Sequence, residues 1–284
     1  MISSLCYGSI NPDIVHRIAA FPTPGDDIRS VDARLTYGGG GANPAVALAA
    51  WGATTALVGN TLGDDPLGRW MIDDLAIRGV DISMIDLSPA ISTPHCVILV
   101  GKDGERTIIS SGYSEAIWQD VPDDAWVGRS VAVVDAYSAR WGAEVIRSAT
   151  DAGVPVVGID VAGRAAAPVS VCVWSVHEHE RQDALALSRS GPDVVLTSGG
   201  EAASWCRNGE ELFTVQPPEV ESVDPTGAGD TLAAMVAFGV GSGWDPDRTL
   251  QMAVSAASLT VGLERGDPIP NLGAITALRE STFG

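Results

Sequence analysis

Short apolar runs alternate with longer amphipathic segments along most of this chain. Buried β-strands are predicted for the short runs, at residues 2–7, 55–59, 130–134, 154–160, 171–175 and 193–197. Helices are predicted for the longer segments, at residues 43–51, 66–78, 142–152, 178–190, 229–241, 246–262 and 274–280. Strands that alternate with helices are typical of an α/β fold in which helical crossovers join parallel strands.

Two segments break this rhythm. Residues 14–37 and 93–111 have the pattern of short alternating strands, and the turn from Gly101 to Gly104 predicts a hairpin in the second segment. Although they are far apart in the sequence, the two segments could pair into one small sheet that covers an edge of the main sheet as a lid. No repeat and no long linker is present, so residues 1–284 are expected to form a single domain with this discontinuous lid.

The composition limits the partners and the compartment. The 284 residues are 45% hydrophobic and 19% charged, which is ample for a buried core. The net charge is −19 and Lys102 is the only lysine, so neither nucleic acid nor an anionic membrane is expected as a partner. The four cysteines are widely separated, which favours reduced thiols, and no targeting segment is recognised. We therefore expect a cytoplasmic protein.

Two common nucleotide motifs are missing. A phosphate-binding loop requires a lysine followed by Ser or Thr, but Lys102 is followed by Asp103, which excludes a P-loop NTPase. The glycine run at residues 38–41 does not extend to GxGxxG, because Asn43 and Pro44 stand where a third glycine is needed. A dehydrogenase with the dinucleotide fingerprint is therefore disfavoured.

A glycine-rich motif, DPTGAGD at residues 224–230, leads directly into an apolar predicted helix. Gly227, Ala228 and Gly229 leave backbone N–H groups unshielded at the helix N-terminus, where the helix dipole attracts an anion. Asp230 then has two interpretations. It could take a proton from a hydroxyl that attacks a phosphoryl group, or it could only cap the first-turn amides. The seven residues alone leave both open.

A second cluster lies near the N-terminus. Asn11 and Asp13 follow the first predicted strand, and GGGGAN at residues 38–43 precedes the first predicted helix. Ligands in open α/β sheets usually bind at the carboxyl ends of strands. Asp13 and Asn43 have the acceptor and donor groups that could hold vicinal hydroxyls of a sugar, and the glycines allow a close approach. Ordinary turn chemistry accounts for the same residues, and taken alone they favour it.

Together, these motifs resemble the ribokinase-like (PfkB) family of carbohydrate kinases. DPTGAGD is similar to the C-terminal signature of the family, and GGGGANPAVALAAWGA at 38–53 with GNTLGDDPLG at 59–68 is similar to its N-terminal signature. GSINPD at 8–13 and FPTPGD at 21–26 resemble the ribokinase branch. The resemblance runs from Gly8 to about Pro270. It implies a three-layer α/β/α sandwich with a mostly parallel central sheet and a small β-sheet lid.

The resemblance also implies roles for individual residues. Asp230 would be the general base, and the γ-phosphoryl group would be bound by the amides of Gly227, Ala228 and Gly229. The sugar would be held by Asn11, Asp13, Gly39 and Asn43. The ATP phosphates would be contacted after a strand by Thr197, Gly199 and Gly200, and residues 252–258 would lie near the adenine.

Metal ions enter through the same resemblance. The family's N-x-x-E element falls on residues 177–180, where His177 replaces asparagine and Glu180 matches, so Glu180 is expected to act on Mg2+ through water. The histidines there do not form HExxH, because Arg181 stands at the last position, and a polar helix start is favoured over a zinc site. Asp224 and Thr226 sit where ribokinase-type members bind a monovalent cation such as K+.

The predicted function is transfer of the γ-phosphoryl group of Mg-ATP to a hydroxyl of a small sugar, with Asp230 removing the proton late. The lid could also join two copies into a homodimer. Substrate specificity is expected in the lid and in the loop after residue 134, which contains Asp135, Tyr137 and Arg140.

Two alternatives remain. A nucleoside kinase of the same fold would stack aromatic side chains on a base, and Phe21 and Tyr37 are the candidates in the first lid segment. A catalytically silent sugar- or nucleotide-binding protein would keep the pocket without the reaction.

Overall fold

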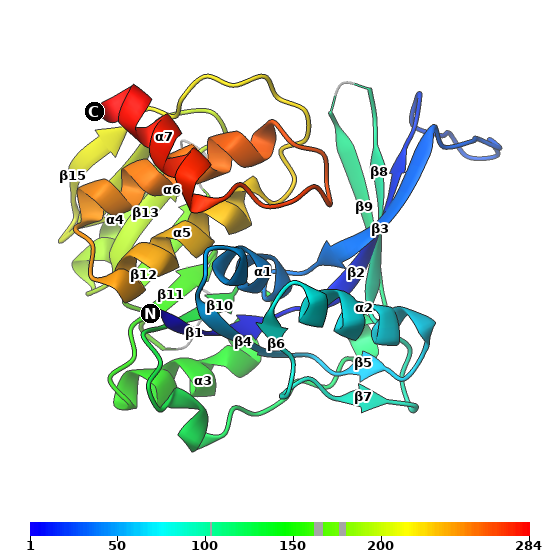
Figure 1. Ribbon diagram of the computed structural model, residues 1–284, viewed down its shortest axis with the longest axis horizontal. Helices are drawn as coiled ribbons and strands as arrows, with labels where there is room; N and C mark the ends of the chain where they lie inside the picture. Colours follow the sequence, from blue (N-terminus) through cyan, green and yellow to red (C-terminus); the bar gives the residue numbers. More distant parts are fainter. Residues whose placement is uncertain (103, 162–166, 176–179) are drawn as a thin grey trace.

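The computed structural model describes residues 1–102, 104–161, 167–175 and 180–284. Within these residues, the largest sheet has nine strands in the order β15-β14-β13-β12-β11-β10-β1-β4-β6 (Figure 1). In that order the strands are Glu210–Val215, Ala203–Arg207, Asp193–Thr197, Val171–Ser175, Val156–Ile159, Val131–Asp135, Ser3–Gly8, Thr54–Gly59 and Val80–Asp81. The strands from β13 to β6 are parallel, whereas β14 and β15 pair antiparallel.

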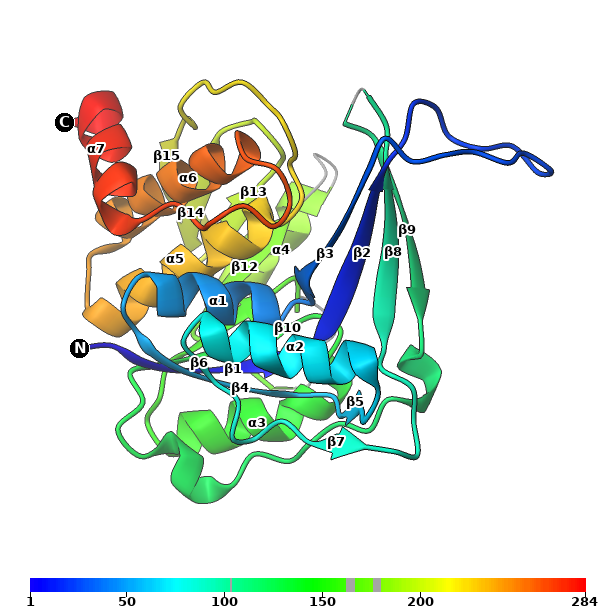
Figure 2. The same cartoon turned by 45° about the vertical axis from the view of Figure 1, so that its right-hand side comes forward.

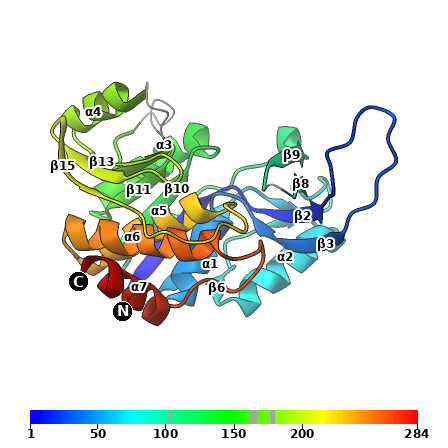
Figure 3. The ribbon, with the colours of Figure 1, turned by 90° about the horizontal axis from the view of Figure 1, so that it is seen from above.

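Helices cover both faces of this sheet (Figure 3). Their bounds are α1 Ala42–Ala50, α2 Pro66–Ile77, α3 Ala139–Asp151, α4 Arg181–Arg189, α5 Ala228–Ser242, α6 Pro246–Val261 and α7 Leu272–Phe283. Helices α1, α5 and α6 pack on one face, and α3 and α4 pack on the other. The predicted three-layer α/β/α architecture with a mostly parallel central sheet is confirmed.

The two faces explain why the central strands are continuously apolar in the sequence. In β1, Cys6 belongs to the core beneath α1 and α5, while Leu5 and Tyr7 belong to the core beneath α3. Successive side chains of a strand point to opposite faces. A strand buried on both faces therefore needs apolar residues at every position.

A smaller sheet stands beside the main one (Figures 1 and 2). Its strand order is β3-β2-β8-β9, with bounds of Asp32–Gly38, Asn11–Arg17, His95–Val100 and Arg106–Ser111. The central pair, β2 and β8, is parallel and the outer pairs are antiparallel. A further two-stranded pairing joins β5, Leu62–Gly63, to β7, Leu87–Ser88.

Some elements differ from the prediction. Strand β2 begins at Asn11, so Asn11 and Asp13 lie on a strand of the small sheet and not in the loop after β1. The antiparallel hairpin β14–β15 was not predicted, because polar residues interrupt its apolar positions and β15 is mostly exposed. The predicted helix at 178–190 begins at Arg181 within the described residues, and residues 177–179 lie outside them.

The backbone at the start of α1 lies directly against the backbone at the end of β1. A Cβ atom at Gly41 would lie 2.7 Å from backbone atoms of Gly8, and one at Gly8 would lie 2.7 Å from the backbone of Gly41. The N–H of Gly41 donates to the carbonyl of Ser9 at 3.0 Å. Two glycines are therefore required where the strand and the helix meet, and this contact fixes the position of Asn43.

We expect Gly41→Ala to lower the free energy of unfolding by about 1–3 kcal/mol, because the added methyl group overlaps backbone that cannot rotate away. Urea denaturation measures this change. Gly262→Ala is the matched control, since its Cβ would meet no atom closer than 3.5 Å, and its effect should stay within about 0.5 kcal/mol. Equal stability of the two variants would contradict the close approach.

Candidate active site

The predicted anion-binding turn lies at the N-terminus of α5. Gly227 adopts a φ of 85°, which favours glycine, and no side chain caps the helix. The N–H of Ala228 donates to the carbonyl of Pro225 at 3.3 Å, so this amide is already engaged. Within the described residues, the amides of Gly229 and Asp230 have no such partner. These open N–H groups at a helix N-terminus are suited to bind a phosphoryl group.

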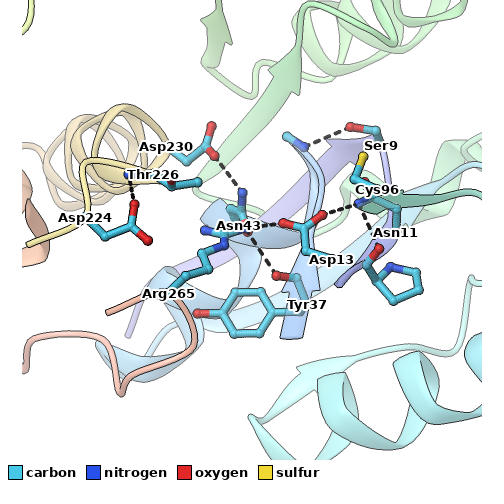
Figure 4. Close-up of polar contacts among 12 residues, drawn as sticks. Ser9, Asn11, Asp13, Tyr37, Asn43, Cys96, Asp224, Thr226, Asp230 and Arg265 are labelled. Atoms are coloured by element: carbon cyan, nitrogen blue, oxygen red, sulfur yellow. Dashed lines mark hydrogen bonds and ion pairs between the residues drawn. The ribbon is translucent and has the colours of Figure 1, made fainter. Parts of the chain in front are cut away.

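The carboxylate of Asp230 turns away from the helix amides and toward α1 (Figure 4). Its Oδ2 accepts a hydrogen bond from Asn43 Nδ2 at 2.6 Å. This geometry rules out the alternative that Asp230 serves only as a helix cap. Loss of hydration raises the pKa of Asp230 to about 6, while the hydrogen bond from Asn43 and the charge of Arg265 oppose the rise. Such a pKa suits a base that works near neutral pH.

Three of the predicted sugar residues form one hydrogen-bonded cluster (Figure 4). Asn11 Nδ2 donates to Asp13 Oδ1 at 2.7 Å, and both residues are almost fully buried. Burial raises the pKa of Asp13, and the ion pair with Arg265 and the hydrogen bond from Asn11 act against it. Asn43 is joined to Asp13 through Arg265, which contacts both. The structure thus brings the two predicted motifs, at 11–13 and 38–43, next to Asp230.

Gly39 supports this cluster without contributing a side chain. Its φ is 101°, and a Cβ atom there would lie 2.2 Å from the carbonyl oxygen of Ser9. Ser9 Oγ in turn accepts from the N–H of Gly40 at 2.8 Å and donates to Asp135 Oδ2 at 2.8 Å. The glycine turn is therefore held in place by the end of β1 and the end of β10.

Asp135, which we expected among the specificity residues, has a structural role. Its Oδ2 also accepts from the N–H of Ser9 at 2.9 Å, and its Oδ1 accepts from the N–H of Ser138 at 2.7 Å. Tyr137, from the same loop, is largely exposed. The side chain of Arg140 lies outside the described residues.

Two residues that the sequence did not indicate contact the cluster. Tyr113 donates from its hydroxyl to Asn11 Oδ1 at 2.6 Å. Arg265 Nη2 forms an ion pair with Asp13 Oδ2 at 2.8 Å and donates to Asn43 Oδ1 at 3.1 Å. Neither belongs to a recognisable motif, and only the fold brings residues 113 and 265 to the start of β2.

The predicted nucleotide residues lie at the carboxyl end of β13. Thr197 is the last residue of that strand, and Gly199 follows with a φ of 54°. Neither Gly199 nor Gly200 has an atom within 4 Å of a Cβ position, so the backbone there is open to a ligand. The carboxyl ends of the parallel strands meet at one edge of the sheet, where β10 and β1 also place the site residues.

The predicted metal residues are only partly placed. Glu180 lies directly before α4, and His177 lies outside the described residues. Asp224 is buried, and its Oδ1 accepts from the N–H of Thr226 at 2.9 Å. Arg106, from the start of β9, approaches Thr226 Oγ1 at 3.5 Å. Among the described residues, no group of three or more His, Cys, Asp or Glu side chains could hold a metal ion by itself.

Comparison with known proteins shows the family of this chain. The sequence matches the model of the "pfkB family carbohydrate kinase" over residues 1–157 and 172–270. The chain belongs to the PfkB family. As a PfkB carbohydrate kinase, it is a phosphotransferase with an alcohol group as acceptor.

Individual relatives align with this chain over nearly its whole length. An ATP-dependent ribose-1-phosphate kinase of Halopiger xanaduensis is 28% identical, and the alignment covers 100% of both chains. The Arabidopsis thaliana ribokinase solved with ribose and ATP has a TM-score of 0.81 at 22% identity, with 99% of each chain covered. An E. coli protein of this fold, solved with ATP and Mg2+, has a TM-score of 0.81 at 19% identity and coverage of 99% and 100%. Both structures share the fold of the PfkB chain described here.

The described helices of this PfkB protein include none that combines the length and the hydropathy of a membrane span. In the described part of the chain, the four cysteines form no disulfide.

We expect the rate of phosphoryl transfer to fall at acidic pH. A raised pKa means that Asp230 is ionised above about pH 6 and protonated below it, and a protonated carboxyl group cannot accept the hydroxyl proton. At saturating Mg-ATP, kcat/KM should lose about tenfold per pH unit well below pH 6 and level off above about pH 7. A rate that stays constant down to about pH 4.5 would show that Asp230 is not the base.

Proposed function

We propose that this PfkB protein is an ATP-dependent sugar kinase that transfers the γ-phosphoryl group of Mg-ATP to a hydroxyl of a small carbohydrate. The supporting observation is the position of Asp230. Asp230 stands in the first turn of α5, which carries the open amides, and its carboxylate bonds to Asn43, which is linked through Arg265 to Asp13. The phosphoryl group of ATP and the acceptor hydroxyl of the sugar would meet at this point.

Each part of the site has a distinct task in the proposed reaction. Asp13 and Asn11 accept or donate hydrogen bonds to the sugar hydroxyls and so orient the acceptor. The amides before α5 stabilise negative charge on the transferring phosphoryl group. Asp230 takes the hydroxyl proton late, as in a loose transition state. Its carboxylate is placed by Asn43, so the base and the sugar share a common support.

A sugar is favoured over a nucleoside because, of the two aromatic candidates, the one that adjoins the site is not free to stack on a base. The ring of Tyr37 is buried, with the guanidinium carbon of Arg78 4.4 Å from its centroid. Phe21 lies on the exposed loop that joins β2 and β3. A catalytically silent binding protein is disfavoured, since binding alone would not require a carboxylate bonded to Asn43 in the same helix turn as the open amides. The Halopiger relative adds phosphorylated pentoses to the sugars that deserve testing.

Mg2+ fits the site as an ion carried by ATP. Its ligands in such enzymes are mostly phosphate oxygens and water, with one or two protein carboxylates. Glu180, before α4 and near the end of β12, is the carboxylate that would hold a water of the ion. When bound, the ion would neutralise phosphate charge during transfer.

The small sheet also offers a surface for a homodimer. Strand β9 is its outer strand, and Ile108 and Ile109 on it are about half exposed. An edge strand with exposed apolar side chains is a common pairing surface. We include a homodimer through this sheet in the proposal.

Asp230→Asn should lower kcat by at least about 100-fold, because the amide cannot accept the proton. ATP binding should persist, since the open backbone amides are unchanged. A coupled ADP-release assay with pentoses, hexoses and ribose 1-phosphate measures turnover, and a thermal-shift titration with an ATP analogue measures binding. Asp73→Asn, an exposed position on α2, is the control. Parent activity in Asp230→Asn would exclude this mechanism.

Glu180→Gln should raise the Mg2+ concentration needed for half-maximal activity, because a neutral amide attracts hydrated Mg2+ less strongly than a carboxylate. The measurement is a Mg2+ titration at constant free ATP. Glu210→Gln, an exposed position at the start of β15, controls for loss of surface charge. If both variants show the wild-type Mg2+ dependence, Glu180 has no part in metal binding.

A further inference from the structure

Arg265, in the loop between α6 and α7, contacts several parts of the site at once (Figure 4). Its side chain is only 10% exposed. Besides Asp13 and Asn43, its Nη2 donates to the carbonyl oxygen of Tyr37 at 3.2 Å. A Cβ atom at Gly227 would lie 2.6 Å from its Nη1. One guanidinium group thus touches β2, the end of β3, the start of α1 and the turn before α5.

The guanidinium remains charged in this position. Burial alone would lower the pKa of Arg265, but the negative charges of Asp13 and Asp230 outweigh burial and raise it. In return, Arg265 opposes the rise in the pKa of Asp230. A fixed positive charge is therefore part of the base's surroundings.

A cavity of about 30 Å3 adjoins the guanidinium. Its lining includes Tyr37, Asn43, Thr226 and Gly227 together with Arg265. This space is large enough for a water molecule.

Unpartnered polar atoms belong to Arg265, which lines this cavity, and to two residues that contact its lining. Within the described residues, the buried side-chain atoms without a hydrogen-bond partner are Thr36 Oγ1, Asp224 Oδ2 and Arg265 Nε. Thr36 lies against Gly266, which lines the cavity, at 3.3 Å from its Cβ position. Asp224 bonds to the amide of Thr226, which also lines it. Of the three, Arg265 alone belongs to the lining, and its unmet N–H indicates a small polar occupant that can accept a hydrogen bond.

The cavity does not fit the monovalent cation that the family resemblance implies at Asp224 and Thr226. The N–H of Arg265 Nε needs an acceptor, and an alkali cation has no lone pair to offer. A fixed guanidinium would also repel a second positive charge at such short range. Water fits this space better, because it is neutral and can accept a hydrogen bond from Arg265.

We propose that Arg265 is the built-in cation of this active site. It is a positioning residue that holds Asp13, Asn43 and the turn before α5 in one arrangement, so that phosphoryl transfer requires no bound K+ or other alkali ion. This inference rests on the kinase function proposed above.

The first test uses the unaltered protein. Its kinase rate is compared in KCl, NaCl and choline chloride at equal ionic strength, and we expect the three rates to agree within roughly twofold once screening is matched. A rate that depends on K+ would overturn the proposal.

The second test removes the guanidinium. Arg265→Ala should lower kcat/KM by about 10- to 100-fold, since hydrogen bonds to charged groups are lost at two substrate residues. Millimolar guanidinium ion, which can occupy the vacated space, should restore a large part of the rate. Arg265→Lys keeps the positive charge but lacks the planar set of N–H donors that reaches several acceptors at once. Its rate should therefore be intermediate.

The pH profile separates this role from a merely structural one. Asp135 and Asp160, at the ends of β10 and β11, raise the pKa of Asp230, whereas Asn43 and Arg265 lower it. Without Arg265, the acidic limb of kcat should therefore move to higher pH, while Arg265→Lys should keep it near the wild-type position. Arg147→Ala is the control, because Arg147 is about half exposed on α3, where it pairs with Glu144. This variant should keep the wild-type rate and the wild-type position of the acidic limb of the kcat profile.

A failure of the inference about Arg265 can be told apart from a failure of the proposed kinase function. If the unaltered protein phosphorylates no sugar, the function fails, and Arg265 is then judged by thermal unfolding. In that case Arg265→Ala should gain a rise in the unfolding midpoint with guanidinium ion or K+ that the unaltered protein lacks. If Arg265→Ala keeps the wild-type rate and limb, or if it gains no response to guanidinium ion, the inference is wrong. Should Arg265→Ala fail to fold, Arg265→Lys and the alkali-ion comparison decide.

Discussion

The hydrogen bond between Asn43 and Asp230 joins the beginnings of two helices that are 187 positions apart in the sequence. It exists because α1 and α5 pack side by side on the same face of the sheet, with their N-termini at the carboxyl ends of the strands. Each helix start is placed by glycine. Gly41 lets α1 approach β1, and Gly227 turns the chain into α5 while leaving its first amides open. The proposed sugar residues and the anion-binding turn lie side by side only because both helix starts are held in these positions.

Acidic groups surround the catalytic candidate Asp230, and one buried guanidinium group opposes them. The chain has 36 acidic and 17 basic side chains, and Asp230 has Asp135 and Asp160 among the charges that raise its pKa. Against this background, the buried guanidinium of Arg265 provides a positive charge where the sugar residues and the anion-binding turn meet. It keeps the pKa of the base lower than it would otherwise be. A protein with so acidic a surface thus keeps a compensating charge in its interior, where solvent ions screen it least.

The small sheet contributes directly to the proposed sugar site. Asn11 and Asp13 are the first residues of β2, and they pair in register with Gly38 and Thr36 of β3. Any movement of this sheet relative to the main one would shift the residues that orient the acceptor, and with them the link through Arg265 to Asn43. Tyr113, just after β9, donates a hydrogen bond to Asn11 and so joins the end of β9 to the start of β2 within this sheet. Substrate binding and the position of the small sheet are therefore coupled through side chains, not only through the backbone.

The sequence by itself predicted the fold class, and its motifs indicated candidate site residues, several of which the structure brings together. Continuous apolar strands, amphipathic helices and the signatures at 38–53 and 224–230 were enough to predict a three-layer sandwich of the PfkB type, because burial on both faces and glycine at backbone contacts leave direct traces in the residue pattern. The antiparallel β14–β15 hairpin left no such trace, since its strands are short and β15 is mostly exposed. The roles of Asp135, Tyr113 and Arg265 were decided only by the tertiary structure. Each of these side chains contacts partners that are distant in the sequence. Their distances in space depend on how the layers pack, and a local residue pattern carries no information about that packing.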